Sequence, residues 1–230
     1  MTFKEFQTLL AIKGIACDNE QASLLENYMF YILNKNESIN LTAITDKDEF
    51  MSKMLFDSAL PLLITDFNEK KVLDTGTGAG FPGSVINILS RADVTMMDAT
   101  KKKLNVIDGF NNHFFKTLHG RVEEYASNPK HKNTYDIVIA RAVAELSILL
   151  EIAMPLIKVG GFFVAMKGPE AYNEIQKAKN AFKKLGCTLI KTDEHTLPTG
   201  DSRVNILIRK DKETNFRYPR AYSDIKKRPL

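Results

Sequence analysis

Hydrophobic residues in the first part of the chain recur every three or four positions, the spacing of amphipathic helices. A capping-box pair, Thr2 and Glu5, opens the first of these helices. Asp18 and Asp46 stand at the expected starts of two more. We therefore expect residues 1–66 to form an N-terminal helical segment.

From Lys71 the pattern changes to short hydrophobic runs that alternate with helical stretches. Strands are expected at Val72–Leu73, Val94–Met97, Ile137–Ala140, Phe162–Met166, Thr188–Ile190 and Val204–Ile208. Helices are expected at Val85–Leu89, Leu104–Phe110, Glu145–Ile157 and Glu170–Leu185. Such alternation predicts an α/β fold with a mostly parallel sheet covered on both faces. The last two strands have no helix between them, so they should pair antiparallel at an edge. This domain spans residues 67–210, and a tail spans 211–230.

Composition places the chain among ordinary globular proteins. It has 230 residues, 44% hydrophobic and 26% charged. No apolar run approaches the roughly 20 residues that cross a bilayer, and Lys4 and Glu5 precede any stretch resembling a secretory signal. Cys17 and Cys187 stand far apart, and the four histidines show no ligand spacing. We therefore expect a cytoplasmic protein without a metal site.

Positive charge is concentrated at the end of the chain. The net charge is +4, yet residues 209–230 hold eight Lys or Arg against three acids, so this segment carries +5. A basic segment on a neutral body favours binding to a polyanion. Charge that only keeps a tail soluble would give the same pattern.

The stretch from residue 74 to 83, where a strand runs into a glycine-rich turn, is the most informative. Glycines let the backbone approach a ligand at the carboxyl end of a strand, where α/β sheets bind cofactors. A dinucleotide-binding loop, G-x-G-x-x-G counted from Gly76, would need glycine where the chain has Phe81. The chain has instead an acid before G-x-G-x-G, at Asp74, Gly76, Gly78 and Gly80.

This loop is typical of S-adenosylmethionine-dependent methyltransferases. Asp74 is suited to accept hydrogen bonds from the amino group of the methionine moiety. Asp98, at the end of the next strand, is suited to accept both ribose hydroxyls. A nicotinamide or nucleotide-sugar cofactor, or a turn without a ligand, remains the alternative. The favoured interpretation is a Rossmann-like class I methyltransferase sheet with an antiparallel last strand.

Two features that the sequence lacks limit which chemical groups could accept the methyl group. Enzymes that methylate exocyclic amines of bases commonly carry an Asn/Asp-Pro-Pro-aromatic signature after the fourth strand, where this chain has Arg141-Ala142-Val143. Methylation of pyrimidine carbon needs a thiolate nucleophile, and neither cysteine is well placed for that role. The site therefore suits an acceptor that needs no covalent activation.

Several motifs, in order along the chain, resemble the RsmG (GidB) family. The loop Asp74–Gly83 is similar to the family's D-x-G-T-G-x-G-hydrophobic-P-G pattern. Further matches are Asn40-Leu41-Thr42, Asp57-Ser58, Arg121–Glu124, Arg141-Ala142, Lys167-Gly168, Tyr218-Pro219-Arg220 and Lys226–Leu230. The family departs from this chain at Met54, where it often has histidine, and in the tail, where its usual glycine is absent.

The resemblance implies a bacterial enzyme that methylates nitrogen 7 of one guanine in small-subunit ribosomal RNA with S-adenosylmethionine. It implies that Gly76 and Phe81 contact the cofactor, that Val122 and Glu123 lie beside it, and that Arg141 reaches the cofactor or the base as the catalytic residue. From the residues alone, Arg141 could instead pair with a carboxylate, and Glu123 could be only a solvated acid.

Basic residues are expected to face the RNA. Lys167 and Arg203 match basic positions of the family, and Lys101 opens a helix, where positive charge opposes the helix dipole. In the tail the candidates are Arg217, Arg220, Lys226, Lys227 and Arg228. If the tail contacts phosphates, cutting the chain before Phe216 should flatten the salt dependence of binding. The expected protein is a monomer that acts on ribosomal RNA or a subunit. A different methyl acceptor, or a non-catalytic RNA-binding protein on the same fold, remains open.

Overall fold

The computed structural model of the chain describes residues 1–111, 114–141 and 144–230. Its centre is a seven-stranded sheet in the order β3-β2-β1-β4-β5-β7-β6. The strands are β1 (Lys71–Thr75), β2 (Asp93–Asp98), β3 (Lys116–His119), β4 (Tyr135–Arg141), β5 (Ile157–Lys167), β6 (Cys187–Thr196) and β7 (Ser202–Lys210). The first five are parallel, and β7 runs antiparallel between β5 and the edge strand β6. The predicted sheet and its antiparallel end are confirmed.

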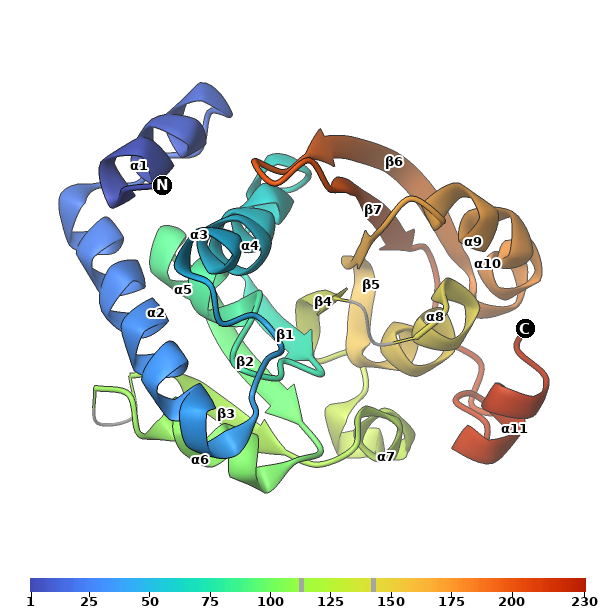
Figure 1. Cartoon of the computed structure of the whole chain (residues 1–230). Helices are drawn as coiled ribbons and strands as arrows, with labels where there is room; N and C mark the ends of the chain where they lie inside the picture. Colours follow the sequence, from blue (N-terminus) through green and yellow to red (C-terminus); the bar gives the residue numbers. More distant parts are fainter. Residues whose placement is uncertain (112–113, 142–143) are drawn as a thin grey trace.

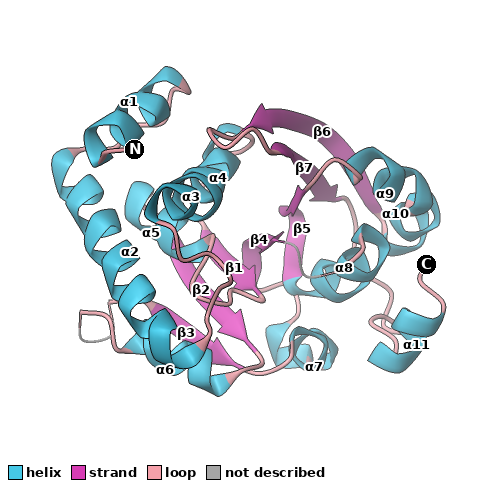
Figure 2. Cartoon of the chain, in the orientation of Figure 1, coloured by secondary structure: helices cyan, strands magenta, loops and turns pink. Residues whose placement is uncertain are grey.

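Helices cover both faces of the sheet (Figure 2). On one side lie α1 (Phe3–Ile12), α2 (Asn19–Ile39), α5 (Gly83–Leu89) and α6 (Lys101–Asp108). On the other lie α7 (Val122–Ser127), α8 (Leu146–Ala153), α9 (Ala171–Lys177), α10 (Lys179–Leu185) and α11 (Tyr222–Lys227). Each face of the sheet is covered by its own hydrophobic core, and alternating residues of each strand point into the two cores. Val72 packs in the first core and Leu73 in the second.

The N-terminal helices share a core with the sheet. Their starts are as predicted, since Thr2 and Asp18 cap α1 and α2 with reciprocal hydrogen bonds to Glu5 and Gln21. One continuous cluster of buried side chains, however, runs from Phe6 in α1 to the strands β1, β2, β4 and β5. Residues 1–66 are therefore packed onto the sheet rather than set apart from it (Figure 1).

The third helical stretch changes its winding as it approaches the sheet. It begins as α3 (Lys47–Phe50), continues as a π-helical turn η1 (Met51–Phe56), and ends as α4 (Asp57–Ala59) and the 3₁₀ turn η2 (Leu60–Leu63). The Asp57 amide bonds to the Ser52 carbonyl, five residues back. Such π turns are rare and occur frequently at functional sites.

Two short elements and one broken helix differ from the expectations. Strand β3 and helix α7 were not predicted because each is short, and no residue of β3 is buried. The predicted helix 170–185 is split at Ala178 into α9 and α10.

The remaining irregular helices are η3 (Pro129–His131) and η4 (Met154–Leu156). Within the described part of the chain, no helix has the length and apolar character needed to cross a membrane.

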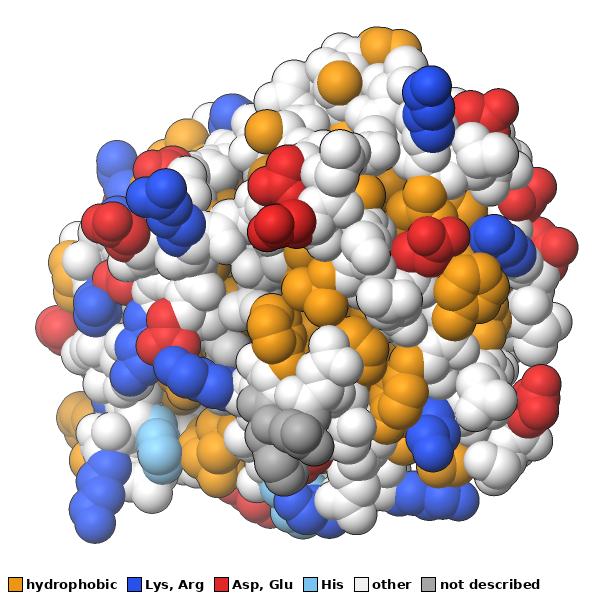
Figure 3. Space-filling model, turned by 90° about the vertical axis from the view of Figure 1, so that its left-hand side faces the viewer, with side chains coloured by type: hydrophobic (Ala, Val, Ile, Leu, Met, Phe, Trp, Pro, Cys, Tyr) orange, Lys and Arg blue, Asp and Glu red, His pale blue; other side chains and the backbone are white. Residues whose placement is uncertain are grey.

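On the face that carries α1 and α2, acidic and basic side chains are intermingled around hydrophobic ones (Figure 3). The charge on that face is therefore mixed.

Candidate functional site

The glycine loop turns sharply at the end of β1. Gly76, Gly78 and Gly80 have φ angles of 70°, 61° and 88°, in the left-handed region that favours glycine. A side chain at Gly80 would also collide with the Tyr28 hydroxyl, which donates to the Ala79 carbonyl oxygen at 2.9 Å. The loop is thus held against α2 by its own backbone.

Asp74 organises this loop from below. It is fully buried, and its Oδ2 accepts hydrogen bonds from the Thr77 hydroxyl at 2.5 Å and the Gly83 amide at 2.9 Å. Burial raises the pKa of Asp74 to about 6, despite these two hydrogen bonds. Its Oδ1 is buried with no hydrogen-bond partner among the described residues. One acceptor atom is therefore left open beneath the loop.

Phe81 lies in the hydrophobic core. Its ring is 2% exposed and packs against Tyr28 and Phe50, with centroids 5.5 Å away in both cases. Arg141 lies over the ring, its Cζ 6.0 Å from the centroid. Phe81 therefore does not form a cavity wall, and the cofactor contact that the resemblance implies for it is not seen. The ring instead packs against Arg141.

A small cavity opens at the carboxyl ends of β1, β2 and β3. Its walls include Gly76 from the loop, Asp98 at the end of β2, and Val122 and Glu123 at the start of α7. Asp98 accepts hydrogen bonds from the Gly78 amide at 3.0 Å and the Thr100 amide at 2.7 Å. Of the predicted cofactor residues, these four line the cavity, whereas Asp74, Gly78, Gly80, Phe81 and Arg141 do not.

These residues fit S-adenosylmethionine by the chemistry of their donors and acceptors. Carboxylates at Asp98 and Glu123 can accept from hydroxyl and amino groups of an adenosine. Gly76 has no side chain between its backbone and the cavity, which suits a close approach of the amino acid end of the molecule. Tyr222, from helix α11 near the end of the chain, also lines this cavity. Tyr222 is not among the residues expected from the sequence to bind a cofactor.

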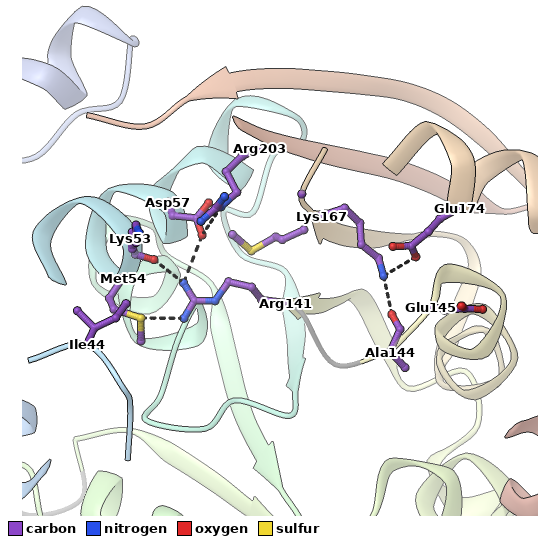
Figure 4. A pocket seen from close by; sticks show the side chains of 12 residues that line it. Ile44, Lys53, Met54, Asp57, Arg141, Ala144, Glu145, Lys167, Glu174 and Arg203 are labelled. Atoms are coloured by element: carbon purple, nitrogen blue, oxygen red, sulfur yellow. Dashed lines mark hydrogen bonds and ion pairs between the residues drawn. The ribbon is translucent and has the colours of Figure 1, made fainter. Parts of the chain in front are cut away.

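A second cavity, of about 580 Å³, lies beside the first, and Ala144 lines both. Figure 4 shows Arg141 at the end of β4 pointing toward Asp57 and Met54, with Arg203 beside them. The Arg141 Nη1 donates to the Lys53 carbonyl oxygen at 3.1 Å and the Ser58 hydroxyl at 3.2 Å. The π-helical turn thus shapes one wall of this cavity.

A buried carboxylate joins the two arginines of this wall. Asp57 Oδ2 lies 3.5 Å from Arg141 Nη1 and 3.5 Å from Arg203 Nε. Burial raises the pKa of Asp57 although both arginines lower it, and desolvation lowers the pKa of Arg141. The Met54 sulfur, at the position where the family often has histidine, accepts from Arg141 Nη2 at 3.5 Å. Arg141 therefore does pair with a carboxylate, and it also lines the cavity.

Lys167 forms part of the opposite wall. It is only 7% exposed, and its Nζ lies 2.7 Å from Glu174 Oε2 and donates to the Ala144 carbonyl oxygen at 2.5 Å. Glu174 also accepts from the Leu146 amide at 2.7 Å, at the start of α8. The Lys167 side chain therefore lines the cavity but is held in a buried ion pair, which ties Ala144 and Leu146 to α9. Its expected contact with RNA stays a prediction.

Sequence reasoning missed Lys53 and left Asp57 without a role. Lys53 pairs with Glu49 at 2.9 Å and Asp201 at 3.4 Å, which links the π-helical turn to the β6–β7 hairpin. The signal for Asp57 was present in the sequence: it is an acid inside the apolar run Met54–Leu63. The matching arginines, however, are 84 and 146 positions away, so only the fold brings them together. Ala142, which the resemblance includes, lies outside the described residues.

The C-terminal tail packs on α8. Glu151 of α8 is fully buried and accepts from Arg220 Nε at 2.8 Å, Nη2 at 2.6 Å and the Arg220 amide at 3.0 Å. Tyr218 and Ile225 are buried in the same core. The expectation that Arg220 faces RNA is therefore corrected, whereas the remaining basic candidates of the tail, namely Arg217, Lys226, Lys227 and Arg228, are exposed. Lys101, at the start of α6, is also exposed.

The cysteines are poorly suited to nucleophilic chemistry. Burial raises the pKa of Cys17 to about 11 and that of Cys187 to about 12, so both are protonated at neutral pH. Among the residues that the structure describes, no cluster of three or more His, Cys, Asp or Glu could hold a metal ion.

Comparison with known sequences gives consistent matches. The model of the GidB family, rRNA small subunit methyltransferase G, matches residues 21–198. Ribosomal RNA small subunit methyltransferase G of Streptococcus sanguinis is 39% identical over 240 residues, covering 100% of both chains. The protein of the same name from Halalkalibacterium halodurans is 39% identical over 241 residues, again covering 100% of both.

Solved structures share the fold at low identity. A candidate methyltransferase from Bacillus halodurans is 17% identical with a TM-score of 0.52, covering 68% of this chain and 100% of that one. A chain from a Haloferax volcanii complex of a methyltransferase activator with a candidate methyltransferase is 14% identical with a TM-score of 0.56, covering 74% of this chain and 95% of that one. These likenesses establish the class I methyltransferase fold.

Proposed function

The chain belongs to the GidB family of rRNA small subunit methyltransferase G, and from this membership we propose that it transfers a methyl group from S-adenosylmethionine to nitrogen 7 of a guanine in small-subunit ribosomal RNA. The observation that carries the proposal is the pair of adjoining cavities. One is lined by the glycine loop and carboxylates, and the other by two arginines and two lysines together with three acids, with Ala144 in both walls. A methyl donor and a nucleotide can thus meet at Ala144.

The small cavity would hold the cofactor. Asp98 would accept from the ribose hydroxyls, Val122 and Glu123 would hold the adenine, and Gly76 would let the backbone come close to the methionine portion. Asp74 keeps the loop in shape from below, and Gly78 and Gly80 give the loop its left-handed turns. Bound there, S-adenosylmethionine supplies an electrophilic methyl group on a sulfonium.

Guanine nitrogen 7 suits this site because it carries a lone pair and no proton. The lone pair forms the new bond to the methyl carbon while the carbon–sulfur bond breaks, so no general base is needed. Catalysis then rests on holding the reactants in line, which is worth up to about 7–11 kcal/mol in favourable intramolecular systems. Catalysis by positioning agrees with the acceptor cavity, because its charged side chains hold one another in place through hydrogen bonds and ion pairs.

We assign Arg141 to contact with the target guanine base. Its guanidinium is held by the Lys53 carbonyl, Ser58 and Asp57, so it meets the acceptor in one orientation. The methylated base is cationic, and Asp57 offsets the positive charge of Arg141 beside it. Arg141 therefore orients the guanine oxygen or a phosphate, while Arg203 and Lys53 attract the RNA chain.

The RNA approaches across the cavity mouth, with exposed contacts from Lys101, Arg217, Lys226, Lys227 and Arg228. The target base must leave its stack to enter the cavity. We place the protein, acting as a monomer, in the cytoplasm with the ribosomal subunits it modifies.

The test is methyl transfer from labelled S-adenosylmethionine to small-subunit RNA, and to subunits, that lack the modification, followed by digestion to nucleosides. Label in 7-methylguanosine is the expected result. Asp98→Ala should abolish transfer through loss of cofactor binding, and Arg141→Ala should reduce it by about 10²-fold or more with cofactor binding kept. Label in another nucleoside, or none despite cofactor binding by the wild-type chain, would reject the proposed acceptor.

A further inference from the structure

The last residues of the chain form a docked segment rather than a loose tail. Arg220 reaches the fully buried Glu151 through its amide and two guanidinium nitrogens, and its Nη2 also donates to the Arg228 carbonyl oxygen at 3.0 Å. Tyr218 is 4% exposed and Ile225 is fully buried against the core around α8. Figure 1 shows α11 beside α8, across the molecule from α1 and α2. We call residues 217–230 the C-terminal clasp.

The clasp contributes a side chain to the small cavity. Tyr222, the first residue of α11, is half-buried and lines that cavity together with Ile152 of α8, the residue next to Glu151. Along the chain, Arg220 stands two positions before Tyr222, and Glu151 stands one position before Ile152. The same ion pair therefore fixes both residues of this wall.

The chemistry of the cavity assigns a role to Tyr222. Asp98 and Glu123 provide carboxylates, whereas Val122, Ile152 and Tyr222 provide apolar and aromatic surface. A purine nucleoside needs this combination, because its ribose is polar and its base is a flat ring that packs on side chains. We propose that Tyr222 is a cofactor-binding residue, whose ring packs on the adenosine part of S-adenosylmethionine, and that the C-terminal clasp completes the cofactor site.

This inference rests on the proposed use of S-adenosylmethionine and adds a residue and a segment to it. It has a thermodynamic consequence, because a ligand that contacts a docked segment must stabilise the docking by the same factor that docking strengthens binding. Cofactor binding should therefore slow hydrogen exchange of the backbone amides in residues 217–230. A tail that only contacts RNA would show no such response.

The experiment measures the dissociation constant of S-adenosylhomocysteine by calorimetry for the full chain and three variants. Tyr222→Ala should bind about tenfold more weakly, the loss typical of removing one aromatic contact to a base. Tyr222→Phe keeps the ring and should bind like the wild type. Phe216→Ala is the matched control, since Phe216 is an aromatic of the same region that is 90% exposed. Hydrogen exchange of residues 217–230, with and without S-adenosylhomocysteine, is the second readout.

The outcomes separate this inference from the proposed function. Weaker binding by Tyr222→Ala alone, with exchange in the clasp slowed by ligand, supports it. Equal binding by Tyr222→Ala and wild type would overturn it and leave the methyltransferase intact. Failure of the wild-type chain to bind S-adenosylhomocysteine would overturn the proposed function itself. Point variants are used because cutting the clasp away would leave Glu151 buried without its partner.

Discussion

Arg220→Ala tests whether the basic tail belongs to the fold. The substitution removes two side-chain hydrogen bonds, at 2.8 and 2.6 Å, from a carboxylate that is fully buried. Breaking a buried ion pair costs about 3–5 kcal/mol because the remaining charge is uncompensated. The Arg220 side chain is 28% exposed, so water screens part of this. We therefore expect a loss of about 2–4 kcal/mol in the free energy of unfolding, or roughly 5–15 °C in Tm.

Urea unfolding followed by circular dichroism measures this loss. Lys226→Ala, which removes an exposed basic residue from the same tail, should change the free energy of unfolding by less than about 0.5 kcal/mol. In a Glu151→Leu background the buried charge is gone, so Arg220→Ala should cost much less there. If Arg220→Ala unfolds at the wild-type urea concentration but has a lower affinity for RNA, Arg220 is an RNA ligand and the reasoning is refuted.

Three further predictions concern the loop, the acceptor cavity and the RNA surface. The pKa of Asp74 is raised from 3.8 to about 6, so its stabilising contribution is complete below pH 4 and is lost as pH rises through 6. That loss amounts to about 3 kcal/mol, and Asp74→Asn should remove this part of the pH dependence of urea unfolding; an unchanged profile would contradict it. Arg141→Ala should reduce methyl transfer by about 10²-fold or more, with a wild-type dissociation constant for S-adenosylhomocysteine, because Arg203 still pairs with Asp57; wild-type turnover would remove Arg141 from the acceptor site. Replacing Lys226, Lys227 and Arg228 together by alanine should lower the slope of log K against log salt for RNA by about 0.7 for each phosphate that the variant no longer neutralises, and an unchanged slope would show that the RNA lies elsewhere.

The periodicity of the sequence predicted most of the fold because buried strands and amphipathic helices leave a strong signal. Val94–Met97 and Ile137–Ala140 are runs that a solvated segment would not carry, and both are central strands. The edge strand β3 is short and carries two polar and one basic side chain among its four residues, so its pattern resembles a loop. The π-helical turn at Met51–Phe56 was equally invisible, since its residues fit an ordinary helix.

The sequence predicted where the candidate site lies better than it predicted which side chains line it. Glycines and an acid after a strand locate a cofactor loop, because only a tight backbone turn requires them. They do not say which way a side chain points: Asp74 and Phe81 lie under the loop, whereas Asp98 and Glu123 line the cavity. Tyr222 could not be found from local pattern, since its place in the cavity depends on an ion pair that spans 69 residues.

The count of basic residues in the tail overstates what RNA can contact. Of the eight Lys and Arg between residues 209 and 230, two are occupied by buried partners within the protein. Lys210 is buried among the Asn133, Met154 and Ile157 oxygens, and burial lowers its pKa to about 8. Arg220 pairs with the buried Glu151, whereas the pair between Arg209 and Asp211 lies at the surface. Six remain for phosphates, so at about 0.7 per phosphate of single-stranded RNA this segment can account for a salt slope of about 4.2 at most. A steeper measured slope would require the cavity mouth, with Arg203 and Lys53, or the helix at Lys101, to carry the rest.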